Sequence, residues 1–176
     1  MRKSNSYTLL FSLFTVALTM VGCNRNAIYD HYELTSLNGW DRTDTLYFSV
    51  KPVKESGLYS EEIALRANAE YPFTELTVVV RQKVMPEGRT EVDTVTFHIT
   101  DKEGNSLGKG FNLIDHQLPL NELLLNKGDS VSINVTHYMR RENLPGIMGV
   151  GIALTLHAPT GINAKEDEKQ ESEAPK

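Results

Sequence analysis

The sequence predicts an all-β domain, arranged as a two-sheet antiparallel β-sandwich of about seven to nine strands. Several short segments alternate apolar and polar residues, which is the period-2 pattern of a half-buried strand. Turn residues at 55–57, 86–88 and 101–105 separate these segments. No helical period is sustained outside the N-terminal apolar run. The residues leave the strand order open between an immunoglobulin-like and a jelly-roll-like arrangement.

The elements are expected in the following order. A first extended segment at 27–34 precedes an alternating strand at 44–53, where Leu46, Phe48 and Val50 share one face. Residues 120–126 are instead predicted to form one turn of helix, which ends at Lys127 and Gly128. Further strands are expected at 63–67, 76–81, 95–99, 107–113, 131–135 and 150–156.

The N-terminal residues carry the signals of a lipoprotein leader. Arg2 and Lys3 precede an uncharged, largely apolar run at 7–20, as in secretory leaders. Gly22 directly precedes Cys23, which resembles the bacterial lipobox, so we expect cleavage after residue 22 and acylation of Cys23, with palmitate among the acyl chains. An uncleaved membrane helix is less favoured, because the run barely reaches the ~17 residues that spanning requires. More than one acyl chain gives stable membrane anchoring.

The predicted organisation has four parts. It comprises a signal peptide at 1–22, a lipidated tether with the first extended segment at 23–38, the β-sandwich domain at 39–160 and a disordered acidic tail at 161–176. The formal net charge of -5 argues against nucleic-acid binding, which needs clustered cations. Since Cys23 is the single cysteine, a disulfide, a cysteine zinc site and a cysteine nucleophile are all excluded once it is acylated.

Residues that could perform catalysis or bind metal are scattered. The five histidines show no i, i+4 pair of the kind that binds metal on a helix. Asp115 and His116 are neighbours, and neighbours on an extended chain point to opposite faces. Glu61 and Glu62 are expected to be solvated at the start of a strand. We therefore expect no metal, no cofactor and no enzyme activity; a hydrolase would require convergence among Asp115, His116, His137 and His157.

Three aromatic residues admit two interpretations. Trp40, Tyr71 and Phe73 could form a platform on which a sugar stacks, or they could pack in the core and corners of the sandwich. Core packing is the favoured interpretation. The platform motivates an alternative function, a carbohydrate-binding envelope lipoprotein.

Several motifs together resemble one family. They are Tyr29-Asp30-His31-Tyr32 after the tether, a Leu-Arg segment that leads to Tyr71-Pro72-Phe73, the glycine-flanked Lys109, and a closing glycine-rich segment at 144–152. This series is similar to the gliding-motility-associated lipoproteins of the GldH type. Leu107 stands where that pattern would have an aromatic residue before Gly108.

The resemblance implies a non-enzymatic accessory or structural component of the gliding motility and associated protein secretion machinery. It also implies an outer-membrane location, and Asn24 does not match the Asp that retains lipoproteins in the inner membrane. We expect the protein to face the periplasm and to bind other envelope proteins of that machinery. Because loops on a rigid sheet carry function, segments 68–74 and 105–111 are the candidate partner surface, with Tyr71, Pro72, Phe73 and Lys109 as its candidate residues.

Overall fold

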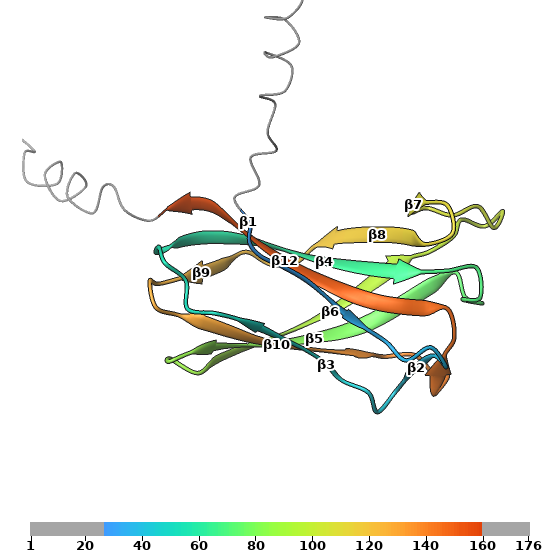
Figure 1. Cartoon of the computed structure of the whole chain (residues 1–176), viewed down its shortest axis with the longest axis horizontal. Helices are drawn as coiled ribbons and strands as arrows, with labels where there is room; N and C mark the ends of the chain where they lie inside the picture. Colours follow the sequence, from blue (N-terminus) through green and yellow to red (C-terminus); the bar gives the residue numbers. More distant parts are fainter. Residues whose placement is uncertain (1–26, 160–176) are drawn as a thin grey trace, which may run out of the picture.

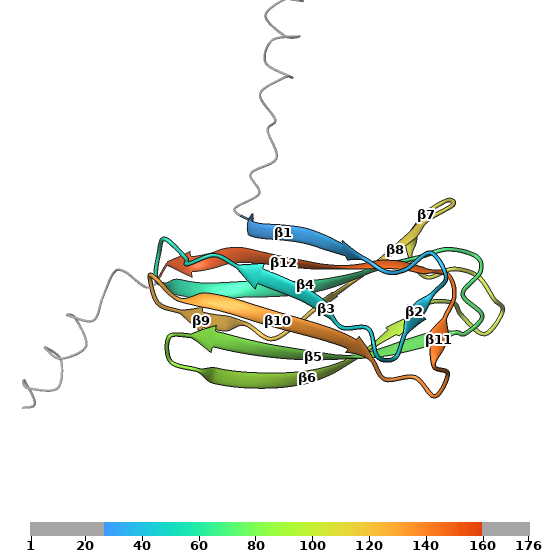
Figure 2. The same cartoon turned by 60° about the horizontal axis from the view of Figure 1, so that its bottom comes forward.

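Two antiparallel sheets face each other in the computed structural model, which describes residues 27–159 (Figures 1 and 2). Within this range the chain forms twelve strands and no α-helix, so the predicted all-β sandwich is confirmed. No helix in the described range is long and apolar enough to cross a membrane. The predicted leader, Cys23 and the whole of the predicted tail at 161–176 lie outside the described residues.

The larger sheet has six strands in the order β1–β12–β4–β8–β7, and β9 pairs with β4 beside this path. Every pair in it is antiparallel, and β1 pairs with β12 along its whole length. The strands are β1 (Ala27–Leu34), β4 (Gly57–Ala67), β7 (Lys109–Gly110), β8 (Ile114–Pro119), β9 (Leu123–Leu125) and β12 (Ile147–Pro159).

The smaller sheet has four strands in the order β3–β10–β5–β6, also all antiparallel. A two-stranded ribbon, β11 with β2, lies at one end of the sandwich (Figure 2). These strands are β2 (Trp40–Asp41), β3 (Leu46–Val50), β5 (Glu75–Met85), β6 (Arg89–His98), β10 (Ser130–His137) and β11 (Asn143–Leu144).

The core lies between the two sheets, where every second residue of each long strand points inward. Ile63 and Leu154 from the larger sheet meet Val80 and Ile133 from the smaller one, and all four are almost fully buried. Burial of one such aliphatic side chain contributes about 1.5–3 kcal/mol relative to leaving it exposed. The alternation that predicted the strands is therefore the alternation that fills the core.

The expected strands are found, with one correction and three omissions: β8 and the two-residue strands β2 and β11. The segment at 27–34 coincides with β1, and each other expected strand overlaps a strand of the structure. The helical turn predicted at 120–126 is wrong: β9 lies there, because Leu123 and Leu125 are buried while Leu124 between them is exposed. Strand β8 was not expected, because its inward positions include His116.

Candidate functional site

The predicted partner surface is divided between buried and exposed side chains. Tyr71 is only 8% exposed, and its hydroxyl donates a hydrogen bond of 2.7 Å to the carbonyl oxygen of Glu75. Phe73 packs edge-on against Tyr71 at a centroid distance of 5.6 Å. Pro72 and Lys109 are exposed. Tyr71 and Phe73 therefore fix the corner between β4 and β5, and the accessible part of the surface is Pro72 and Lys109.

Trp40 does not offer a surface for stacking. Its side chain is fully buried, its Nε1 donates a hydrogen bond of 3.1 Å to the carbonyl oxygen of Asp44, and its ring lies edge-on to His137 at 5.3 Å. With Tyr71 also buried and Phe73 packed against the core, the favoured interpretation of these aromatics as packing residues is confirmed. A sugar platform made of these three rings is excluded.

The prediction that Glu61 is solvated is wrong. Strand β4 begins at Gly57, so Glu61 lies in its middle, on the inward face with Ile63, and is 1% exposed. The amide Nε2 of Gln82, on the opposite sheet, donates a hydrogen bond of 2.5 Å to Glu61 Oε2. The Oε1 atoms of both side chains are buried without a hydrogen-bond partner.

The electrostatic consequence for Glu61 is large. Burial raises the pKa of its carboxyl group to about 8, against the lowering effect of the Gln82 hydrogen bond, and the negative charges of Asp93 and Glu91 add to the rise. The neutral acid is therefore the main form at pH 7. A neutral carboxyl group can donate its proton, which a carboxylate cannot do.

Two of the residues considered for catalysis, Asp115 and His137, are engaged in structural contacts. Asp115 accepts a hydrogen bond of 2.8 Å from Arg66 Nε. His137 is buried beside Trp40, and its Nε2 lies 3.2 Å from the carbonyl oxygen of Glu142. Burial lowers the pKa of both His116 and His137. Within residues 27–159, no group of three or more His, Cys, Asp or Glu side chains is arranged to hold a metal ion.

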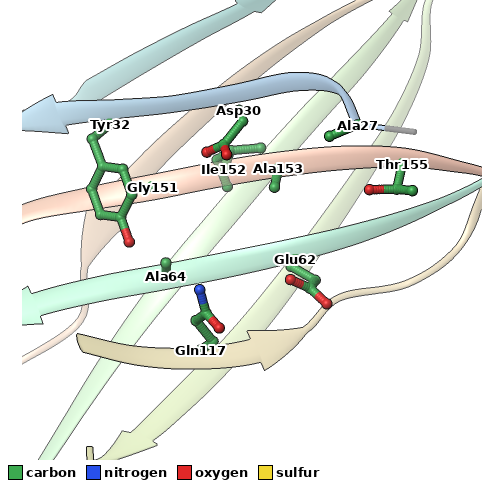
Figure 3. Close-up of a pocket in the computed structure, with 10 residues that line it drawn as sticks. All are labelled: Ala27, Asp30, Tyr32, Glu62, Ala64, Gln117, Gly151, Ile152, Ala153 and Thr155. Atoms are coloured by element: carbon green, nitrogen blue, oxygen red, sulfur yellow. The ribbon is translucent and has the colours of Figure 1, made fainter. Parts of the chain in front are cut away.

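A groove of about 330 Å³ crosses the outer face of the larger sheet (Figure 3). Asp30 and Tyr32 of β1 stand on one side of it, and Glu62 and Gln117 stand on the other. The floor between them consists of small residues, including Gly151 of β12. We call this feature the outer-face groove. Its lining combines carboxylates, an amide and a phenol, which are groups that hydrogen-bond hydroxyl-rich ligands.

The shape of the outer-face groove depends on Gly151. A Cβ atom at Gly151 would lie 2.7 Å from Tyr32 Cζ, so only glycine allows the tyrosine ring to pack directly against the backbone of β12. The Arg66 guanidinium lies 4.6 Å from the centroid of the same ring, a cation–π distance. Tyr32 is thus held between the backbone and a cation, at one end of the groove.

A second groove, of about 520 Å³, lies at the edge of the sandwich between β6 and β8. Phe97 and His98 line one side, and residues 115–118 of β8 line the other. The segment at 107–109 covers part of it. We call this feature the edge groove. It adjoins the second predicted partner segment, 105–111, which includes Lys109.

Large apolar side chains beside the edge groove are exposed. Phe111 is 94% exposed, Leu107 is 56% exposed and Leu113 is 42% exposed. All three belong to the segment that forms β7 and its turns, which projects from the sandwich (Figure 2). Sequence reasoning placed a candidate partner surface here because loops on a rigid sheet carry function, but it carried no signal that Phe111 would be exposed rather than packed.

The comparisons with known proteins identify a family. A family model described as GldH lipoprotein matches residues 27–154. Gliding motility lipoprotein GldH of Flavobacterium johnsoniae is 28% identical over 111 residues, which are 63% of this chain and 66% of that protein. The GldH homolog of Christiangramia forsetii is 26% identical over 107 residues, 61% of this chain and 64% of that protein. The chain thus spans slightly less than two thirds of the length of these relatives.

Similarity to solved structures is low. A family GH115 4-O-methyl-α-glucuronidase with specificity for decorated arabinogalactans aligns with a TM-score of 0.43 and 14% identity, over 76% of this chain and 18% of that chain. A family 35 carbohydrate binding module from Clostridium thermocellum aligns with a TM-score of 0.34 and 16% identity, over 70% of this chain and 89% of that chain. Similarity at this level carries no argument about function.

Proposed function

Because the chain belongs to the GldH lipoprotein family, we propose that it is a non-enzymatic accessory component of the gliding motility and associated protein secretion machinery. The observation that carries the proposal is the family match over residues 27–154, which covers nearly all of the described domain. The predicted leader at 1–22, followed directly by Cys23, supports a lipid-anchored envelope protein. We place it in the outer membrane, facing the periplasm.

The contacts of the polar residues support a role without catalysis. Asp115 is paired with Arg66, and His137 faces a backbone carbonyl, so neither is positioned as a free acid or base. A protein of this kind acts by binding, and its rigid sandwich would present loops and edges to partners.

A gene deletion in the native organism tests the proposed function. We expect the deletion to reduce gliding, or protein secretion where the organism does not glide, and the wild-type gene to restore it. A Cys23→Ser variant should lose incorporation of an alkyne-labelled palmitate probe, leave the membrane fraction and fail to complement. Normal gliding and secretion in the deletion strain would contradict the proposal.

Affinity capture from crosslinked outer membranes tests the partner claim. We expect motility or secretion proteins to be recovered with the native lipoprotein. Recovery of the protein alone, from membranes where the machinery is intact, would contradict a stable place in the machinery.

Carbohydrate binding is a second candidate function, and the outer-face groove is the observation that favours it. Glu62 lines the groove and is exposed, so Glu62→Ala should weaken binding of a soluble oligosaccharide without unfolding the domain. Titration calorimetry with envelope-derived oligosaccharides checks this. Absence of heat with every oligosaccharide, at millimolar concentration, would remove this candidate.

A further inference from the structure

Strand β8 leaves part of the larger sheet's edge open. It pairs with β4 from Ile114 to Pro119 on one side. On its other side, β7 pairs only with Asp115 and Ile114. Among the described residues, positions 116–119 therefore have no neighbouring strand on that side. An edge strand presents backbone groups that another extended chain can pair with. On this side β8 offers the N–H and C=O of Gln117 and the C=O of Pro119, because His116 and Leu118 bond to β4.

The open edge of β8 forms one side of the edge groove, and β6 of the smaller sheet forms the other. Phe97 and His98 of β6 face it from the smaller sheet. Farther along the same side of the sandwich, Arg89 donates a hydrogen bond of 3.0 Å to the carbonyl oxygen of Leu124, and Asn121 donates one of 2.8 Å to Asp93. The gap between the sheet edges is thus bridged at one end, and it is hollow beside positions 115–118.

A buried polar atom in this groove lacks a partner. His116 lines the groove and is only 7% exposed, and its Nε2 has no hydrogen-bond partner. Such an atom costs free energy unless something binds it. Gly108 lies directly over this ring, because a Cβ atom there would be 2.8 Å from His116 Cε1 and 2.7 Å from the carbonyl oxygen of Asp115. Any larger residue would push the loop off the strand.

The charges of the groove indicate what kind of segment fits. Asp115 is paired with Arg66, and His98 is paired with Glu75 at 3.0 Å. Lys109 also lines the groove, and no ion pair is formed by its exposed ammonium group within residues 27–159. A carboxylate on the incoming segment would complement it. The exposed side chains of Leu107 and Phe111 would pack against apolar residues of the same segment.

We propose that the edge groove binds an extended segment of a partner protein, which pairs with β8 as an added strand and carries an acidic residue opposite Lys109. Backbone pairing supplies affinity in such strand addition, and pockets for alternate side chains supply specificity. His116 Nε2 bonds to a polar group of that segment. The inference rests on the proposed function only for the source of the partner, which is the motility and secretion machinery.

Photocrosslinking of the full chain in living cells tests the proposal. The crosslinking amino acid p-benzoylphenylalanine replaces Phe111 or Gln117, and Tyr47 and Tyr138 serve as matched exposed control positions outside the groove. We expect Gln117, which lines the groove, and Phe111, on the projecting segment that follows Lys109, to crosslink to one short acidic and apolar segment of one protein, identified by mass spectrometry. The control positions should not yield that segment. Groove crosslinks that match those of the controls, or that map to a second copy of this chain, would overturn the proposal.

A synthetic peptide of the crosslinked segment gives the second readout. We expect it to slow hydrogen exchange at the Gln117 amide at least tenfold, because this N–H faces away from β4 and would donate to the added strand. Lys109→Glu and Phe111→Asp should weaken its binding at least tenfold, and Tyr138→Asp should not change it. An unchanged exchange rate in β8 at saturating peptide would overturn strand addition.

Genetic complementation separates this proposal from the proposed function. If deletion impairs gliding or secretion and the Lys109→Glu, Phe111→Asp double variant restores both fully, the proposed function stands and the edge-groove proposal fails. If deletion has no effect, the proposed function fails, while a mapped crosslink still supports strand addition at β8.

Discussion

Two regions of this protein depart in opposite directions from the ordinary distribution of polar and apolar residues. In the core, Glu61 and Gln82 place a carboxyl group and an amide between the sheets. At the edge, Leu107, Phe111 and Leu113 expose large apolar side chains on a projecting segment. Buried polar groups and exposed apolar patches are the informative exceptions in a folded protein. The first departure affects stability, and the second affects binding.

The core pair should give the largest effect, a loss of stability as the pH rises. The folded pKa of Glu61 is about 8, above its ordinary value of 4.5, so the folded state holds a proton that the unfolded state releases in between. The stabilisation is complete below pH 4.5 and is lost as the pH rises to about 8. Urea unfolding should show a free energy of unfolding that falls by on the order of 1 kcal/mol per pH unit between about pH 6.5 and pH 8. Below that range the lowered pKa values of the buried His116 and His137 act in the opposite sense.

Replacement of the carboxyl group should remove that dependence. Glu61→Gln keeps the shape of the side chain and cannot ionise, so its free energy of unfolding should no longer fall between pH 6.5 and pH 8 and should exceed that of the wild type at pH 8. Glu62→Gln, at the exposed neighbouring position, should keep the wild-type slope. Equal slopes for wild type and Glu61→Gln would show that another group causes the pH dependence.

Glu61 and Gln82 show how much of the core could be predicted from the sequence. Inward and outward positions followed from alternation, and 27–34 was assigned correctly as an extended segment. Glu61 has the same parity as Ile63 and Leu65, but the strand was expected to begin only at Ile63, so Glu61 was predicted to be solvated. No sequence pattern could show that Gln82, on the other sheet, provides its partner. That contact exists only once the sheets are stacked.

The edge was less predictable, because its features depend on a loop. Strand β8 lacks a clean apolar alternation, since His116 occupies a buried position, and so it was not recognised. Segments 68–74 and 105–111 were chosen as loops on a rigid sheet, yet only the structure separates the exposed Phe111 from the buried Tyr71. Chain order also gave no sign that β6 and β8 would enclose a groove.

An intermediate effect is expected at the loop that covers β8. In Gly108→Ala, the new methyl group would lie 2.4 Å from Ile114 Cγ2 and 2.7 Å from the Asp115 carbonyl oxygen, closer than real contacts allow. We expect a loss of about 1–3 kcal/mol in the free energy of unfolding, measured by urea denaturation, as for other overpacked sites. At Gly88 a Cβ atom meets nothing within 4 Å, so Gly88→Ala should cost only the backbone strain of its φ of 80°. Equal losses in the two variants would show that Gly108 is not sterically required.

The smallest effect on stability should come from the most exposed apolar residue. Phe111 is 94% exposed, so Phe111→Ser removes almost no buried surface, and the free energy of unfolding should change by less than about 0.5 kcal/mol. A residue with so little role in folding gains nothing from being phenylalanine unless it contacts another molecule. Urea denaturation of Phe111→Ser checks that its free energy of unfolding is nearly unchanged. Phe97→Ser, which removes a buried ring from the core, serves as the destabilised reference. A loss above 1 kcal/mol for Phe111→Ser would mean that the ring packs on its own domain in solution, and the contrast between the buried pair and the exposed segment would then no longer hold.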